Sequence, residues 1–181
     1  MTGERWRLAL PHRAIHPVER SWLVEPDSLT ARCQRNASAF RVRLLDARLG
    51  EALPDELAAV HAENGQKSLC RVREVALECD GVPVIFAHTI LPESPRGRLS
   101  RWMARLGTRS LGSLLFAFPG FARGPLEYRR LDARHPLYRE AARFCEAGKH
   151  LWARRSLHML DGQRVLVTEV FLPAIRELRK P

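Results

Sequence analysis

The chain has 181 residues and 45% of them are hydrophobic, which suits one domain, residues 1–181, whose core needs no metal or disulfide. No apolar run approaches the roughly 20 residues of a membrane span, and the N-terminal residues are too broken by Arg and Pro for a signal peptide, so we expect a cytoplasmic protein without membrane insertion. The net charge of +10 comes almost wholly from arginines spread along the chain rather than gathered in a basic block, so we do not expect a nucleic-acid-binding protein.

The N-terminal third predicts two short helices followed by a strand. Pro17 suits the first turn of one helix, and Asp27 or Ser28 can cap a second helix that runs to about Gln34. A linker with one helical turn is expected later, over residues 53–65. Between them, apolar and basic side chains alternate, which predicts a strand with one wet face: Phe40, Arg41, Val42, Arg43 and Leu44.

Two long hairpins carry most of the predicted sheet. Asp80-Gly81 and Asp161-Gly162 are two-residue turn signals, and each lies between two stretches rich in β-branched residues. With the earlier strand, they predict an antiparallel sheet of five or six strands. Because helices interrupt these strands, the fold class is α+β, a single domain with helices packed on the sheet.

Several helices are predicted around the hairpins. One is expected near Leu99–Leu106, another opens at Thr108, and a third covers about residues 136–146. Residues 1–15 and 174–181 are expected to be flexible ends.

The last strand of the sequence contains an unexpected charge. Four residues share one of its faces: Val165, Val167, Glu169 and Phe171. Both faces are otherwise mostly apolar, so we expect Glu169 to be buried. In the first hairpin, Arg73 shares a face with Val75 and Leu77 and is expected to point into the same interior. A buried charge is costly unless it is paired, so both residues need an explanation.

Two explanations remain open. In the structural one, Arg73 and Glu169 form a buried ion pair, or Arg73 points outward and pairs across strands. In the functional one, the planar guanidinium of Arg73 binds a ligand carboxylate, while Glu169 accepts from or donates to a ligand hydroxyl. The helix that opens at Thr108 adds free backbone N–H groups near Leu111, which also favour an anion. A ligand with a carboxylate at one end and a hydroxyl at the other would fit.

Other chemistries are not indicated. The cysteines have no CxxC spacing and no clustered histidines, so we expect reduced thiols and no metal site. His88 and His158 lie in predicted strands and are interpreted as framework residues. Gly112-Ser113 lacks the second glycine of a nucleophile elbow. The four cysteines are Cys33, Cys70, Cys79 and Cys145.

Five strings of the sequence together resemble one family. In chain order they are WLVEPDSLTARC, VREVALECDGVPVIFAHTILP, LGTRSLGSLLF, LWARRSLHMLDGQ and VLVTEVFLP. From about Trp22 to Pro173 the chain thus resembles the bacterial chorismate pyruvate-lyases, the chorismate lyase family. The resemblance implies conversion of chorismate to 4-hydroxybenzoate and pyruvate, the first step of ubiquinone head-group synthesis. It also implies a monomeric enzyme without a metal or an organic cofactor.

The resemblance places the product in an internal cavity beneath helical flaps. The product-binding arginine of the family falls on Arg73, and the glutamate that faces the product hydroxyl falls on Glu169. A backbone contact near the carboxylate falls on Leu111, and a flap position usually occupied by methionine falls on Leu29. For the second carboxylate of chorismate, the neighbouring strand offers two candidates by proximity, Arg154 and Arg155.

Two points set this chain apart or leave a second reading. The segment between Gly120 and Lys149 is longer than its counterpart in the family, so its helix is expected to alter the flap or cover the cavity. The alternative function is a non-enzymatic effector domain that binds aromatic acids with the same fold. Such domains normally follow a DNA-binding winged helix, which the residues before Trp22 do not supply, so we expect an enzyme.

Overall fold

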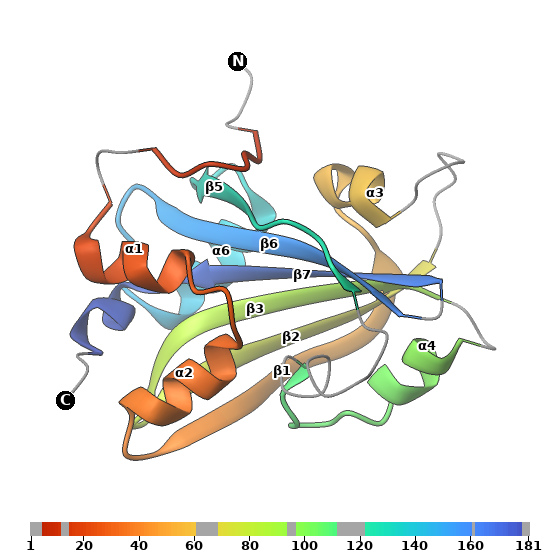
Figure 1. The fold of residues 1–181 in the computed structure, drawn as a ribbon, viewed down its shortest axis with the longest axis horizontal. Helices are drawn as coiled ribbons and strands as arrows, with labels where there is room; N and C mark the ends of the chain where they lie inside the picture. The colour runs from red at the N-terminus through yellow and green to blue at the C-terminus, as the bar shows by residue number, and fades with distance from the viewer. Residues whose placement is uncertain are drawn as a thin grey trace.

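One antiparallel sheet forms the centre of the molecule (Figure 1). The computed structural model describes residues 5–11, 15–60, 69–93, 97–111, 122–160 and 162–178. Within them the strand order is β1-β2-β3-β7-β6-β4, and β5 also pairs with β6. The strands are β1 (Phe40–Glu51), β2 (Leu69–Cys79), β3 (Val82–Pro92), β4 (Ala122–Arg123), β5 (Glu127–Leu131), β6 (Leu151–Leu160) and β7 (Gln163–Phe171). The α+β fold is confirmed, with seven strands instead of five or six because β4 and β5 are both short.

Both predicted hairpins are present. In the β2–β3 turn, Asp80 has φ 52° and Gly81 has φ 81°, and a two-residue type I′ turn requires positive φ at both positions. The β6–β7 hairpin closes with Leu160 opposite Gln163, next to Gly162 at φ 73°. The local turn chemistry therefore sets the register of each hairpin.

The two hairpins meet where β3 pairs with β7. Ala87 of β3 lies opposite Glu169 of β7, and Thr89 of β3 lies opposite Arg73 of β2. Since successive residues of a strand point to opposite faces, this register puts all four side chains on one face of the sheet.

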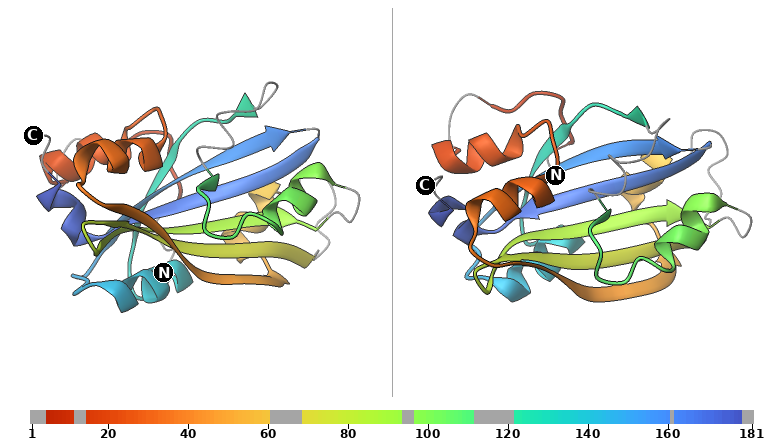
Figure 2. Two further views of the ribbon diagram at one scale, coloured as in Figure 1. Left: turned by 90° about the horizontal axis from the view of Figure 1, so that it is seen from below. Right: turned by 60° about the horizontal axis from the view of Figure 1, so that its bottom comes forward.

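Helices cover both faces of the sheet (Figure 2). We call the face covered by α1 (Pro17–Leu23), α2 (Leu29–Asn36) and α4 (Arg98–Met103) the front face. The opposite face, covered by α3 (Pro54–Val60) and α6 (Pro136–Ala141), is the back face. Two short 3-10 turns are η1 (Ala142–Phe144) and η2 (Pro173–Glu177). Among the residues described, no helix is long and apolar enough to cross a membrane.

Buried apolar side chains hold the helices to the sheet on each side. Trp22 of α1 and Phe171 of β7 are in the front-face core, and Phe86 of β3 and Leu137 of α6 are in the back-face core. Burying a side chain of this size stabilises the fold by roughly 1.5–3 kcal/mol relative to exposure. The sheet is thus buried on both sides, which explains why its strands read as nearly continuous apolar runs.

The helices differ from their predictions in extent and place. Ser28 is the N-cap of α2, and its hydroxyl accepts a hydrogen bond from the Ala31 amide at 3.3 Å. Helix α4 ends at Met103, three residues earlier than expected. Helix α6 lies on the back face, so the expectation that it covers the cavity is wrong. The helix predicted to open at Thr108 extends into residues 112–121, which lie outside the described ranges.

Both ends of the described chain contact the rest of the molecule. Trp6 donates a hydrogen bond to α3, and Arg7 forms a β-bridge with β5. Ile175 of η2 is fully buried. At these positions the prediction of flexible ends, over residues 1–15 and 174–181, is wrong because side chains of both segments pack against the sheet and its helices.

Candidate active site

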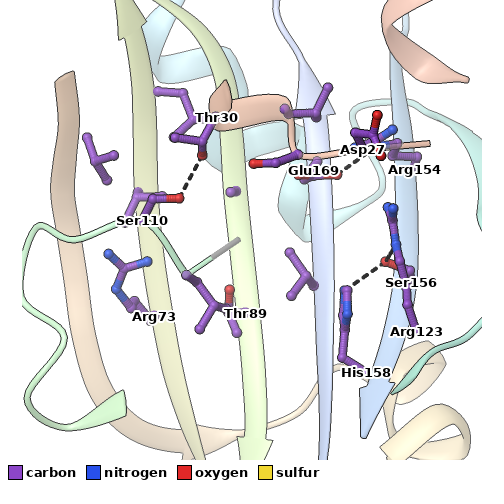
Figure 3. Close-up of a pocket in the computed structure, with 18 residues that line it drawn as sticks. Asp27, Thr30, Arg73, Thr89, Ser110, Arg123, Arg154, Ser156, His158 and Glu169 are labelled. Carbon is purple, nitrogen blue, oxygen red and sulfur yellow. Dashed lines mark hydrogen bonds and ion pairs between the residues drawn. The ribbon is translucent and has the colours of Figure 1, made fainter. Parts of the chain in front are cut away.

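A pocket lies on the front face, between the sheet and two segments that cover it (Figure 3). It holds about 600 Å³ of space, including its opening to solvent. One covering segment is the connector between α1 and α2, residues 24–28, with the first turn of α2; the other follows α4 and ends at Leu111. The floor is apolar and is formed by Val75, Leu77, Ala87 and Val167. An apolar cavity with a few polar groups is typical of small-molecule sites.

Arg73 lies in the wall of this pocket and is 4% exposed. Its Nη2 donates to the carbonyl oxygens of Gly107 at 3.0 Å and Arg109 at 2.9 Å, which fixes the guanidinium. Burial lowers the pKa of Arg73 to about 10, so the side chain remains a cation at neutral pH. Among the described residues no carboxylate forms an ion pair with it, and its Nε has no hydrogen-bond partner. It is therefore a buried cation that can bind an anion.

Glu169 lines the same pocket, but its partner is Arg154. The Arg154 Nε lies 2.6 Å from Glu169 Oε2, on the neighbouring strand, and Arg154 is 1% exposed. The predicted ion pair between Arg73 and Glu169 is wrong, because the two residues lie on strands that are not neighbours, β2 and β7. The carboxylate side chain keeps 17% of its exposure and faces the pocket.

Arg155 does not belong to this pocket. Its Nε lies 2.7 Å from Glu127 Oε2, its Nη1 donates to the Asp55 carbonyl at 2.9 Å, and its guanidinium lies over the Trp6 ring. All these contacts are on the back face. Of the two candidates for a second carboxylate, the alternation of the strand leaves only Arg154.

The two predicted leucines lie in the covering segments. Leu29, the first residue of α2, is 2% exposed, and Leu111 is 6% exposed; both line the pocket. Next to them, Thr30 Oγ1 and Ser110 Oγ form a hydrogen bond of 2.7 Å that joins the two segments over the pocket. The structure thus brings five of the six predicted site residues together: Leu29, Arg73, Leu111, Arg154 and Glu169.

Three polar residues of the pocket were not predicted. Arg123 Nε donates to Ser156 Oγ at 3.2 Å, and Ser156 Oγ lies 2.9 Å from His158 Nε2. Burial, together with the charges of Arg123 and Arg154, lowers the pKa of His158 to about 3, so this ring is neutral at physiological pH. His158 was interpreted as a framework residue, but it shares the pocket face with Arg154, as their even spacing along one strand could have indicated. For Arg123 the sequence gave no such signal.

The charges that line the pocket favour an anionic ligand. Three arginines face two carboxylates, Asp27 and Glu169, while His158 is uncharged. The excess of positive charge in a partly enclosed, low-dielectric space attracts anions more strongly than the same charges would in water.

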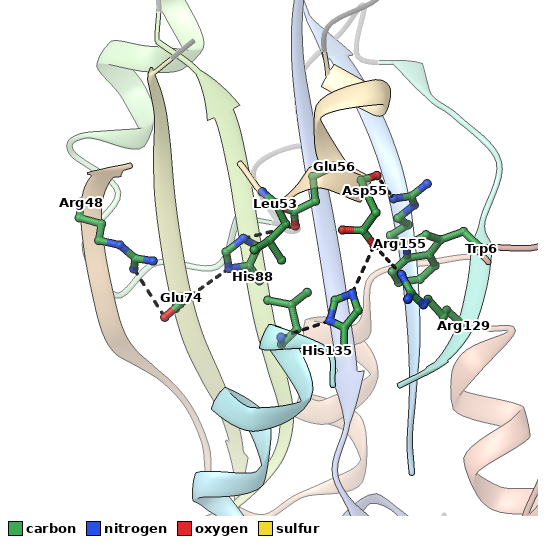
Figure 4. A network of polar contacts seen from close by, with 11 residues as sticks. Trp6, Arg48, Leu53, Asp55, Glu56, Glu74, His88, Arg129, His135 and Arg155 are labelled. Atoms are coloured by element: carbon green, nitrogen blue, oxygen red, sulfur yellow. Dashed lines mark hydrogen bonds and ion pairs between the residues drawn. The ribbon is translucent and has the colours of Figure 1, made fainter. Parts of the chain in front are cut away.

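A second polar cluster lies on the back face (Figure 4). His88 Nδ1 lies 3.0 Å from Glu74 Oε1, and His88 Nε2 lies 3.3 Å from Glu56 Oε1. Burial alone would lower the pKa of His88, but the hydrogen bonds and charges of the two carboxylates raise it to about 9. We call these three residues the His88 cluster. Its cation is held between two anions, so its charges are matched within the protein.

Asp55 of α3 connects the same face to the N-terminal segment. It accepts hydrogen bonds from Trp6 Nε1 at 2.9 Å and Arg129 Nη1 at 2.6 Å, and lies 3.2 Å from His135 Nε2. Burial would raise the pKa of this carboxyl, but these partners hold it well below its usual range. In the part of the chain that the structure describes, no three His, Cys, Asp or Glu side chains are grouped to hold a metal ion.

Comparison with known sequences gives the same family throughout. The family model for chorismate lyase matches residues 5–179. A protein of Dechloromonas aromatica named probable chorismate pyruvate-lyase is 63% identical, with 99% of this chain and 100% of that protein covered. One of the same name from Nitrosomonas eutropha is 41% identical, covering 94% of this chain and 99% of that protein.

Solved structures share the fold at low identity. The effector domain of PhnF from Mycobacterium smegmatis has a TM-score of 0.51 at 19% identity, covering 81% of this chain and 89% of that chain. The C-terminal domain of the histidine utilization repressor from Pseudomonas syringae has a TM-score of 0.53 at 6% identity, covering 75% of this chain and 93% of that chain. At such identities the likeness concerns the fold alone.

Proposed function

The chain belongs to the chorismate lyase family, and from this we propose that it is a chorismate pyruvate-lyase that converts chorismate into 4-hydroxybenzoate and pyruvate. The observation that carries the proposal is the pairing of Arg73 and Glu169 across one apolar floor, since the first has no carboxylate partner among the described residues. A ligand with a carboxylate and a hydroxyl on opposite sides of a ring suits such a pocket.

Chorismate has three polar groups to place. It is a cyclohexadiene with a ring carboxylate, a hydroxyl at C4 and an enolpyruvyl ether at C3. The planar fork of Arg73 would bind the ring carboxylate, near Leu111. Glu169, held as a carboxylate by Arg154, would accept the hydrogen bond of the C4 hydroxyl. The enolpyruvyl carboxylate would then lie toward Arg154 and Arg123, the cations on the Glu169 side of the pocket.

The reaction breaks the C3–O bond of the ether and the C4–H bond. The electron pair of the C4–H bond enters the ring, which becomes aromatic, and the C3–O pair leaves with enolpyruvate. A proton delivered to the methylene carbon of enolpyruvate gives pyruvate, so all atoms are accounted for. Because aromatisation supplies the driving force, the protein has to hold one conformer and stabilise the negative charge that develops on the leaving group.

The covering segments would serve this chemistry by excluding water. Leu29, Leu111 and the hydrogen bond between Thr30 and Ser110 close the pocket above the sheet. Water that entered would weaken each charged contact and compete for the leaving group. We further propose that the product supplies the ubiquinone head group and that the enzyme acts as a cytoplasmic monomer without an added cofactor.

The test is to incubate purified protein with chorismate and EDTA and to measure 4-hydroxybenzoate and pyruvate by chromatography. We expect equal amounts of the two, well above the control without protein. If 4-hydroxybenzoate binds but no chorismate is consumed, the chain is an effector-type domain, the alternative that its fold likeness to regulator domains favours. If neither binding nor turnover is found, the proposal fails.

A further inference from the structure

One arginine contacts both the candidate catalytic carboxylate and the segment that covers the pocket. Arg154 Nε lies 2.6 Å from Glu169 Oε2, and Arg154 Nη1 donates to the carbonyl oxygens of Glu25 at 2.6 Å and Leu23 at 3.3 Å. Arg154 is 1% exposed, so this guanidinium is wholly buried. The two carbonyls belong to the end of α1 and to the α1–α2 connector, residues 24–28.

The connector leads directly into the part of the chain that lines the pocket. Asp27, Ser28, Leu29 and Thr30 follow the two carbonyls and all face the cavity. The position of this wall therefore depends on where the connector is held. Because Arg154 also fixes Glu169 on the sheet, one guanidinium sets the distance between the covering wall and the carboxylate below it.

The geometry requires an arginine rather than any cation. The carboxylate is bound by Nε and the two carbonyls by Nη1, so the contacts leave a planar group along different in-plane directions. A lysine ammonium at the end of a flexible stem keeps the charge but cannot hold both partners in one fixed plane. Loss of the planar group therefore separates positioning from charge.

We propose that Arg154 is a positioning residue, which places the Glu169 carboxylate and the α1–α2 connector relative to each other. The inference rests on the proposed lyase function for its effect on turnover, but the link between carboxylate and connector is a property of the fold. When the link is broken, substrate still meets Arg73, but the carboxylate and the covering wall no longer take their places together.

The chain contains a matched control for this idea. Arg155 is the next residue, is 8% exposed, and is also bound to a carboxylate, Glu127, and to a backbone carbonyl, that of Asp55, but on the back face. We expect Arg154→Lys to lower kcat about tenfold or more with KM changed less than about threefold. Arg155→Lys should leave kcat within about twofold. Thermal unfolding of both variants shows whether a loss of stability explains the difference.

Hydrogen exchange of the amides in residues 24–30 tests the link without using activity. Arg154→Lys and Glu169→Gln should speed exchange there by about tenfold, while Arg155→Lys and Glu127→Gln should leave it unchanged. Unchanged exchange in the first two variants overturns the inference whether or not chorismate is turned over. Equal losses of kcat in the Arg154 and Arg155 variants overturn it as well.

The two proposals can fail separately. If the unaltered protein has no lyase activity but the exchange result holds, the proposed function fails and the link stands. If turnover is normal in Arg154→Lys, the lyase function stands and the positioning role is lost. A double variant, Arg154→Lys with Glu169→Gln, should be no slower than the slower single variant, because both act through one contact. Multiplied losses would contradict a shared role.

Discussion

The two faces of the sheet use the same residue types to opposite ends. On the front face the arginines outnumber the carboxylates, and Arg73 has no carboxylate among the described residues. On the back face the charged groups bind one another. The two arrangements come from adjacent residues of single strands, front then back: Arg73 and Glu74, Thr89 and His88, Arg154 and Arg155, Glu169 and Thr168.

Two buried histidines report this difference directly. The arginines around His158 and its burial lower its pKa to about 3, whereas the carboxylates around His88 overcome burial and raise its pKa to about 9. The same side chain is thus neutral in the pocket and a cation behind it. We conclude that the back face is matched for stability and that the front face keeps positive charge for a ligand.

The largest expected effect is on the back face. His88→Leu removes the cation of the His88 cluster and leaves Glu56 and Glu74 buried without it, which should cost about 3–5 kcal/mol of unfolding free energy. Urea unfolding measures this loss, and the exposed His150→Leu should change it by less than about 0.5 kcal/mol. Below the unfolding temperature kcat should stay within about twofold. A loss under about 1 kcal/mol would mean that the cluster is not held by its charges.

On the front face, the same kind of change should affect turnover instead. Glu169→Gln keeps the volume and a hydrogen bond to Arg154 but removes the charge, so kcat should fall about a hundredfold while the protein stays folded. Glu127→Gln is the control, since it alters the equivalent ion pair with Arg155 on the other face. Near-normal turnover in the first variant would make the carboxylate charge dispensable.

The pH dependence of stability should separate the two faces in one protein. His88 has a folded pKa of about 9, above the ordinary 6.5, so its contribution is complete below pH 6.5 and is lost as pH rises through 9. His158 has a folded pKa of about 3, so its contribution is lost as pH falls from 6.5 toward 3. Each should change the unfolding free energy by about 1–3 kcal/mol over its window.

Variants assign the two limbs of that profile. His88→Gln should flatten the alkaline limb and leave the acid limb in place, while His158→Gln should flatten part of the acid limb only. Asp55 also contributes to the acid limb, because its partners lower its pKa. If the two variants flatten the same limb, the opposite surroundings of the two rings are not what sets their charges.

The smallest expected effect distinguishes binding from stability at one residue. Arg73→Met should weaken 4-hydroxybenzoate binding more than about tenfold, which calorimetry can measure, because a buried carboxylate loses its partner. Its unfolding free energy should change by less than about 1 kcal/mol, because the lost contacts are offset by removal of a buried charge. Arg71→Met, which breaks an ion pair with Glu93 on the same strand, should leave binding unchanged. Unaltered binding in Arg73→Met would remove it from the site.

Much of the site follows from patterns within single hairpins. Alternation along β2 and β7 predicted that Arg73 and Glu169 point inward, and the structure puts both on the pocket face. The turn beside Gly162 also fixes Arg154 opposite Glu169, because each lies six residues from the last pair of the hairpin, Leu160 and Gln163. The true partner of Glu169 was therefore predictable from hairpin register, although the face alone did not identify it.

What could not be predicted depends on contacts distant in the sequence. Nothing local indicates that β3 pairs with β7, which places Ala87 opposite Glu169. Nor does the pattern of α6 say which side of the sheet it covers, since the sheet is apolar on both. Arg123 enters the pocket because the short strand β4 pairs with the far end of β6. These features follow from packing of the whole sheet rather than from any segment.

The pairing of β3 with β7 also has a consequence for how the protein folds. Each hairpin can form early, because its turn brings neighbouring strands together at little entropic cost. Arg73 and Glu169, however, belong to different hairpins and share a pocket only after β3 and β7 have met. The ligand site is therefore among the last parts of the chain to be completed. A bound product would stabilise the protein by slowing its unfolding, and would leave the rate of folding unchanged.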